Sequence, residues 1–135
     1  MNKIVIDELH FDAAHYLPVE FGKCHNLHGH RYHIEQLTLE TIKIVDFNKV
    51  KKVIDQYDHC LLIPEKDKKP WTDMFLKTLP CEIAIKIINA SDTTVENIGR
   101  QIAKDLLRID GVQHVTFLLY ETDTCGVLID EAKSE

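Results

Sequence analysis

The chain has 135 residues, of which 44% are hydrophobic and 28% are charged, as in an ordinary globular protein with a real hydrophobic core. Its formal net charge of -6 argues against a general nucleic-acid-binding protein, because binding to phosphates requires a positive surface. No apolar run is long enough to cross a membrane, and the opening MNKIVIDELHF does not predict a signal peptide. The four cysteines lack C-x-x-C spacing, which favours a reduced intracellular protein. We therefore expect one cytoplasmic domain over residues 1–135.

The first third of the chain predicts two strands. Residues 3–11 alternate between two faces, with Ile4 and Ile6 on one and Leu9 and Phe11 on the other. A loop over 12–29, marked by proline and glycine, connects this strand to the second predicted strand, over 30–45.

Two helices and two more strands are predicted after residue 45. Asp46 is the N-cap of a helix that ends near 58–59. Thr93 and Glu96 form the capping box of a second helix. The apolar stripes of these helices are Val50, Val53, Ile54 and Tyr57, and Val95, Ile98, Ile102 and Leu106. The remaining segments are an irregular stretch over 61–92 with one short strand, and strands over 114–121 and 126–130. This order predicts an α+β fold with a four-stranded antiparallel sheet and two helices on one face.

A cluster of histidines suggests a metal site. His28 and His30 are two residues apart at the start of a strand, so both imidazoles point to one side. His15 closes the first strand segment, four residues beyond the predicted strand over 3–11, and an antiparallel neighbour could deliver it as a third ligand. Three protein nitrogens with an open fourth position are typical of catalytic zinc. The alternative, that these are surface or core histidines, fits an isolated histidine better than an H-x-H pair.

Cys24, four residues before His28, has two possible roles. A thiol near a metal and near Lys23 can have a lowered pKa and act as a base. It can also be a fourth zinc ligand, which would close the shell and make the zinc structural. The spacing leaves both roles open.

Carboxylates at two other places are further candidates. In the dipeptide Asp58-His59 the carboxylate can orient the imidazole for proton relay, although a histidine at a helix end is also common. Glu121 ends an apolar strand, where it is either exposed or placed to grip a ligand. A carboxylate suits an amino-pyrimidine edge because it accepts two parallel N–H bonds.

Several of these residues lie in motifs of one known family. The segments DAAHYL, CHNLHGH, VDFNKVKKVID, YDH, TTVENI and YET resemble the 6-pyruvoyltetrahydropterin synthase family, which includes 6-carboxytetrahydropterin synthase. The resemblance covers most of the chain except roughly 61–90. Two features depart from the family pattern: the connection after the second strand is shortened to LETIKIVDF, and the segment over 61–92 is longer than expected. It implies a tunnelling fold (T-fold), with zinc on His15, His28 and His30. It further implies a proton-transfer triad of Cys24, Asp58 and His59 and substrate binding by Glu121 and Thr94.

The resemblance also implies a reaction. The family substrate is 7,8-dihydroneopterin triphosphate, and the spacing C-x3-H-G-H resembles the 6-carboxytetrahydropterin synthases of queuosine-type deazapurine pathways. The leading prediction is therefore a zinc-dependent lyase that forms 6-carboxy-5,6,7,8-tetrahydropterin. The main competing prediction is a 6-pyruvoyltetrahydropterin synthase, which eliminates triphosphate from the same substrate. A non-catalytic zinc-binding module is a candidate of a different class, and a zinc hydrolase is a weaker candidate.

The strand over 114–121 predicts assembly. Val115, Phe117 and Leu119 are apolar on one face, and Leu118 and Tyr120 are largely apolar on the other. Two helices can cover only one face of a sheet, so we expect subunits to close their sheets into a barrel. The family resemblance implies a homohexamer built from two trimers, in which Asp58 and His59 reach the zinc and Cys24 of a neighbour.

Overall fold

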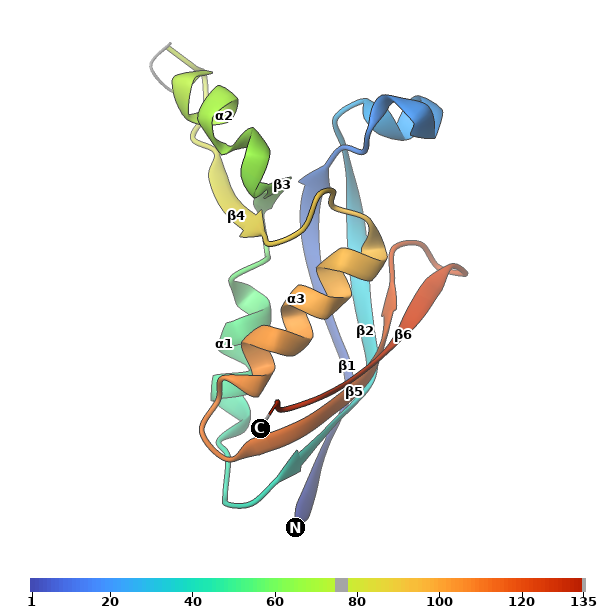
Figure 1. The fold of residues 1–135 in the computed structure, drawn as a ribbon, viewed down its shortest axis with the longest axis vertical. Coiled ribbons are helices and arrows are strands. Elements are labelled where there is room, and N and C mark those ends of the chain that lie inside the picture. Colours follow the sequence, from blue (N-terminus) through green and yellow to red (C-terminus); the bar gives the residue numbers. More distant parts are fainter. Residues whose placement is uncertain (75–77, 135) are drawn as a thin grey trace.

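The computed structural model describes residues 1–74 and 78–134, which form a long curled sheet with helices along one side (Figure 1). In chain order the elements are β1 (Asn2–His15), the 3-10 helix η1 (Val19–His25), β2 (His28–Thr41), α1 (Phe47–Asp55), β3 (Cys60–Pro64), η2 (Glu65–Asp67), α2 (Lys68–Met74), β4 (Ala84–Ile88), α3 (Val95–Leu107), β5 (Val112–Tyr120) and β6 (Gly126–Ala132). Among the described residues, no helix has the length and apolarity needed to cross a bilayer.

The sheet has six strands in the order β4-β3-β1-β2-β5-β6. Strands β1, β2, β5 and β6 pair antiparallel, as predicted. The prediction of a purely antiparallel, four-stranded sheet is wrong, because β3 pairs parallel with both β1 and β4. Four of the five residues of β3 are buried, and a strand covered on both faces reads as a continuous apolar run without alternation.

A bulge in the middle of β2 changes which residues face the core. Gln36 has φ 53°, and the register against β5 shifts between Glu35 and Thr38. An extra residue in one strand reverses the alternation beyond it. Along β1, which pairs with β2, the alternation changes between Ile6 and Glu8, opposite the bulge. Ile4 and Leu9 therefore both pack against the core. Our assignment of these two residues to opposite faces is therefore wrong.

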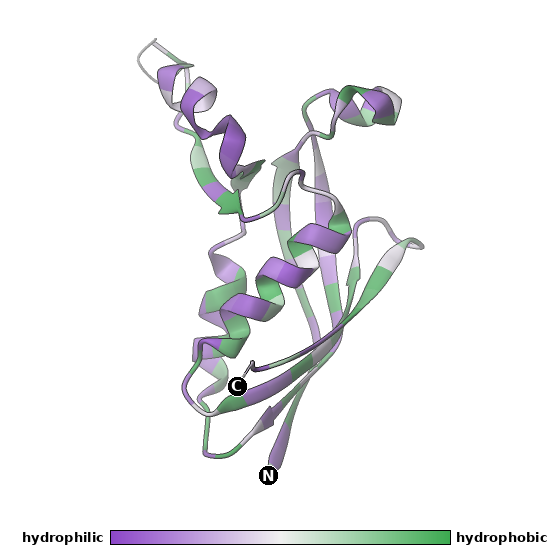
Figure 2. Cartoon of the chain, viewed as in Figure 1, coloured by the Kyte–Doolittle hydropathy of each residue, from purple (hydrophilic) through white to green (hydrophobic). Residues whose placement is uncertain are grey.

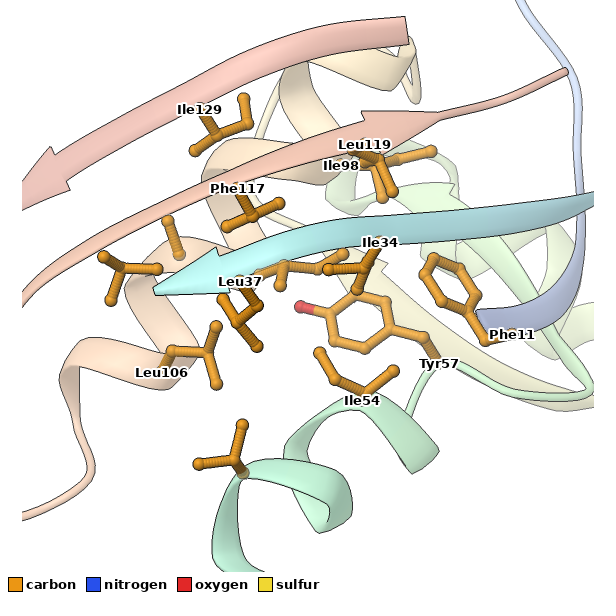
Figure 3. Packing of buried hydrophobic residues seen from close by; sticks show 14 of the residues in the cluster. Phe11, Ile34, Leu37, Ile54, Tyr57, Ile98, Leu106, Phe117, Leu119 and Ile129 are labelled. Atoms are coloured by element: carbon orange, nitrogen blue, oxygen red, sulfur yellow. The ribbon is translucent and has the colours of Figure 1, made fainter. Parts of the chain in front are cut away.

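Helices α1 and α3 cover the inner face of the sheet and enclose the core (Figure 3). The Asp46 cap is confirmed, since its side chain accepts a hydrogen bond from the Asn48 backbone N–H. The cap of α3 is Thr94 rather than the predicted Thr93. Glu96, Arg100 and Lys104 are exposed on α3 and form its hydrophilic side (Figure 2).

Candidate functional site

The pairing of β1 with β2 brings three histidines together. His15 lies directly opposite His28 in the antiparallel register, and His30 follows two residues later on the same face. The candidate ligand atoms of the three side chains all lie within 4.8 Å of one another. Their ring centroids are 4.7 to 5.2 Å apart. The three histidines could therefore hold a metal ion.

Backbone carbonyls orient two of these rings. His15 Nδ1 lies 2.8 Å from the Thr93 carbonyl oxygen, and His28 Nδ1 lies 2.6 Å from the Asn26 carbonyl oxygen. A carbonyl only accepts, so the proton of each neutral imidazole is on Nδ1 and the Nε2 lone pair is free. Both Nε2 atoms are buried and have no hydrogen-bond partner within the described part of the chain. Unpaired buried nitrogens that converge in this way fit a bound metal.

Burial favours the neutral form of His15 and His30. It lowers the pKa of His15 to about 4, although the Thr93 carbonyl opposes the shift. Burial also lowers the pKa of His30, against the opposing charge of Glu121. A neutral imidazole is the form that binds a metal ion, so the site is ready for a cation near neutral pH.

Glu121 lies against the histidine cluster. It follows the last residue of β5, and its Oε1 is 3.4 Å from His15 Nε2 and 3.6 Å from His30 Nε2. Its side chain is 26% exposed, so the structure does not leave it at an exposed edge. The carboxylate is positioned to accept hydrogen bonds from a molecule bound beside the histidines.

Cys24 is exposed on η1, the short helix that joins the two histidine-bearing strands. It is not a member of the group of side chains whose ligand atoms converge. Two bonds shape this connection: the Leu17 backbone N–H donates to the Cys24 carbonyl at 2.8 Å, and His25 Nδ1 lies 2.7 Å from the Leu17 carbonyl. The structure therefore places the thiol outside the ligand set.

Asp58 and His59 form a hydrogen-bonded pair at the edge of β1. Asp58 Oδ2 is 2.8 Å from His59 Nδ1, and Asp58 Oδ1 accepts from the Asp12 backbone N–H at 2.9 Å. The bond from Asp12, followed by the contact with His59, holds the pKa of Asp58 below its usual range. The His59 backbone N–H donates to the Asp12 carbonyl oxygen at 2.6 Å, which holds this turn against β1. The backbone of His59 has φ 58°.

The structure brings only some of the predicted site residues together. His59 and His30 both line a cavity of about 580 Å³. Among the described hydrogen bonds and ion pairs, none joins His59 to Cys24. The predicted substrate-binding residue Thr94 uses its hydroxyl to cap α3, where it accepts from the Asn97 N–H at 3.4 Å.

Sequence reasoning missed the residues that orient the site. Thr93 and Asn26 act on the histidines through their carbonyl oxygens, and Asp12 acts on Asp58 through its N–H. Every residue type has these backbone groups, so no side-chain pattern could identify them. Tyr32 was also missed. Its hydroxyl is buried without a partner in the described structure, and its ring lies 5.7 Å from that of His30.

Comparisons with known proteins indicate the same family as the sequence motifs. The profile of the family described as 6-pyruvoyl tetrahydropterin synthase matches residues 4–132. The 6-carboxy-5,6,7,8-tetrahydropterin synthase of Rickettsia typhi is 34% identical over 133 residues, covering 87% of this chain and 92% of the relative. The enzyme of the same name from Haemophilus influenzae is 28% identical over 131 residues, covering 87% and 91%.

Solved structures share the fold. The 6-pyruvoyltetrahydropterin synthase of Plasmodium vivax superposes with a TM-score of 0.67 at 20% identity, covering 98% of both chains. A putative dihydroneopterin aldolase from Vibrio cholerae superposes with a TM-score of 0.58 at 11% identity over the same shares. The match of the family profile to nearly the whole chain settles the assignment: this chain belongs to the 6-pyruvoyl tetrahydropterin synthase family.

Proposed function

We propose that this chain is a zinc-dependent lyase that converts 7,8-dihydroneopterin triphosphate to 6-carboxy-5,6,7,8-tetrahydropterin. The observation that carries the proposal is the convergence of His15, His28 and His30, two of which have unpaired buried Nε2 atoms. Zinc suits three neutral imidazoles, and three protein ligands leave a position for substrate. The names of the curated relatives support the carboxylated product.

The remaining residues take roles that fit their positions. Bound zinc would supply Lewis-acid polarisation of a substrate oxygen. To Cys24 we assign the removal of a proton from the substrate carbon, since it is a thiol outside the ligand set on the helix that joins the two histidine-bearing strands. Asp58 holds the Nδ1 proton of His59, which leaves Nε2 free to exchange protons. Glu121 accepts the N–H groups of the pterin amino-pyrimidine edge.

Product analysis tests the reaction. Zinc-loaded protein is incubated with 7,8-dihydroneopterin triphosphate, and the products are identified by mass spectrometry. A carboxylated tetrahydropterin together with acetaldehyde supports the proposal. A pyruvoyl product would support 6-pyruvoyltetrahydropterin synthase, whose name the family profile and the Plasmodium vivax structure carry. No turnover by the zinc-loaded protein would contradict both reactions.

The Glu121→Gln variant is expected to bind the pterin about 10- to 100-fold more weakly, because it replaces a charge-assisted acceptor with a neutral one. Zinc content should not change if Glu121 contacts the ligand rather than the metal. Affinity is measured by calorimetric titration. The matched control is Glu131→Gln, on β6 outside the site. Unchanged affinity in Glu121→Gln would contradict the anchoring role.

We further propose that the chain assembles by closing its sheet with that of a neighbour. The outer face exposes apolar side chains, with Val5 57% and Leu128 68% exposed. In the described part of the chain, β3 pairs with β1 only at Ala13 and Ala14, and the Asp58–His59 turn bonds Asp12. The remaining edge of β1 and the outer edge of β6 have no strand partner among the described residues. Pairing β6 of one subunit with β1 of the next would satisfy both edges and bury apolar surface, as in a hexamer of two trimers.

A complementation experiment tests whether sites are shared between subunits. Cys24→Ala and Asp58→Ala chains, each inactive alone, are unfolded, mixed in equal amounts and refolded together. With random assembly about one quarter of shared sites receive both intact residues, so roughly a quarter of wild-type activity should return. Chains refolded separately and then mixed are the control. A monomer in solution, or mixed oligomers without activity, would refute the shared site.

A further inference from the structure

The cavity that His59 and His30 line has the form of a ligand site. Its volume of about 580 Å³ is typical of pockets for small molecules. Ala14 and Gly29, which lie opposite each other in the β1–β2 register, form part of its wall. Because these residues carry almost no side chain, a flat molecule can approach the strands closely.

Another part of the wall comes from described residues that lie between β3 and β4 in the chain. Trp71 of α2 lines the cavity together with Glu82 and Ile83. Trp71 is the single tryptophan of the chain, and it lies in the stretch where the resemblance to the family motifs is interrupted. The family motifs of the sequence therefore do not predict this wall.

Hydrogen bonds fix the orientation of the indole. Trp71 Nε1 donates to the Tyr16 hydroxyl oxygen at 2.9 Å, and that hydroxyl donates to Asp67 Oδ2 at 2.7 Å. Tyr16 and Asp67 are not among the residues that line the cavity. The indole N–H is therefore occupied by a protein partner, which leaves the apolar part of the ring available to a ligand in the cavity. Since Tyr16 directly follows His15, the wall is attached to the strand that carries the metal site.

We infer that Trp71 is the stacking surface of this cavity for the planar heteroaromatic ring of the substrate. The inference rests on the proposed function for the identity of that ring, a pterin. A ring held in one orientation by hydrogen bonds loses little freedom when a second ring stacks on it. Glu121, His15 and His28 do not line this cavity, so the cavity meets the histidine cluster at His30, which lines it and whose Nε2 is 3.6 Å from Glu121 Oε1.

Fluorescence of the single tryptophan tests this contact directly. In the zinc-loaded full-length protein, saturating 7,8-dihydroneopterin triphosphate should reduce severalfold the bimolecular rate of acrylamide quenching of Trp71, taken from fluorescence lifetimes. Guanine serves as a second planar probe. In calorimetric titrations Trp71→Ala should weaken pterin binding about tenfold, and Trp71→Phe should weaken it less, because a smaller aromatic surface remains. Phe47→Ala, which removes an exposed aromatic ring outside the cavity, should bind like wild type.

The outcomes separate this inference from the proposed function. Pterin binding that leaves Trp71 as accessible to acrylamide as before would overturn the inference and leave the pterin reaction standing. Protection by guanine without any binding of the pterin would support the stacking surface and contradict the proposed function. Wild-type affinity of Trp71→Ala for the pterin would also overturn the inference. The same holds if this variant loses its oligomeric state while its separated subunits keep wild-type affinity for the pterin.

Discussion

Replacing His28 with alanine is expected to remove zinc from the protein and abolish turnover. His28 supplies one of three converging nitrogens, and its Nε2 has no other partner among the described residues. Loss of a group that only orients a ligand typically lowers metal affinity 10- to 100-fold, so loss of the ligand itself should lower it by more than about 100-fold. Metal content is measured by mass spectrometry after dialysis, and activity is measured with added zinc.

A histidine on the other face of the same strand provides the control. His33 is also on β2, but it is an odd number of positions from His28 and so lies on the opposite face of the strand. Its Nδ1 is 3.7 Å from Glu8 Oε1. His33→Ala should retain about one zinc per chain. If His28→Ala retained full metal, or if both variants lost it equally, the assignment of the ligands would be wrong.

Replacing Cys24 with alanine is expected to leave zinc and fold intact and to lower turnover about 10²- to 10⁴-fold, the range for loss of a general base. The physical reason is the position of the thiol, which is exposed on η1 and outside the converging ligand atoms. The loss should appear in kcat more than in KM, because the base acts at the chemical step. Steady-state kinetics and zinc content are measured on the same preparation.

The exposed Cys81, which precedes β4, provides a matched control for Cys24. Cys81→Ala should have wild-type kinetics. Loss of zinc together with activity in Cys24→Ala would instead show that the thiol is a fourth ligand. That result would favour the non-catalytic zinc-binding module over the lyase.

Local patterns were sufficient to predict the histidine cluster. The H-x-H spacing places His28 and His30 on one face because strand side chains alternate, and the structure confirms this arrangement. The position of His15 opposite His28 depends on the β1–β2 register, which the sequence suggested only through a predicted neighbouring strand. The Asp58–His59 contact is between adjacent residues, so the pair could be found without any knowledge of the fold.

The parallel part of the sheet was not predictable in the same way. Residues 61–92 showed one strand-like run, whereas the structure pairs β3 with both β1 and β4. Parallel pairing joins segments separated by a crossover, and the strands involved carry no alternation that marks their faces. The β2 bulge at Gln36 was missed for a related reason: a one-residue shift in alternation can be recognised only against the neighbouring strands.

Sequence alone was thus enough for the family, the two helices that cover the sheet, the four antiparallel strands and the residues capable of binding a metal. These features depend on residue type and on spacing over a few positions. The tertiary structure decided which backbone groups orient His15 and Asp58, and that Trp71 lines the same cavity as His59. Such contacts join positions far apart in the chain, and many of them use backbone atoms that every residue has. Their partners are therefore set by the packing of the whole sheet rather than by any local pattern.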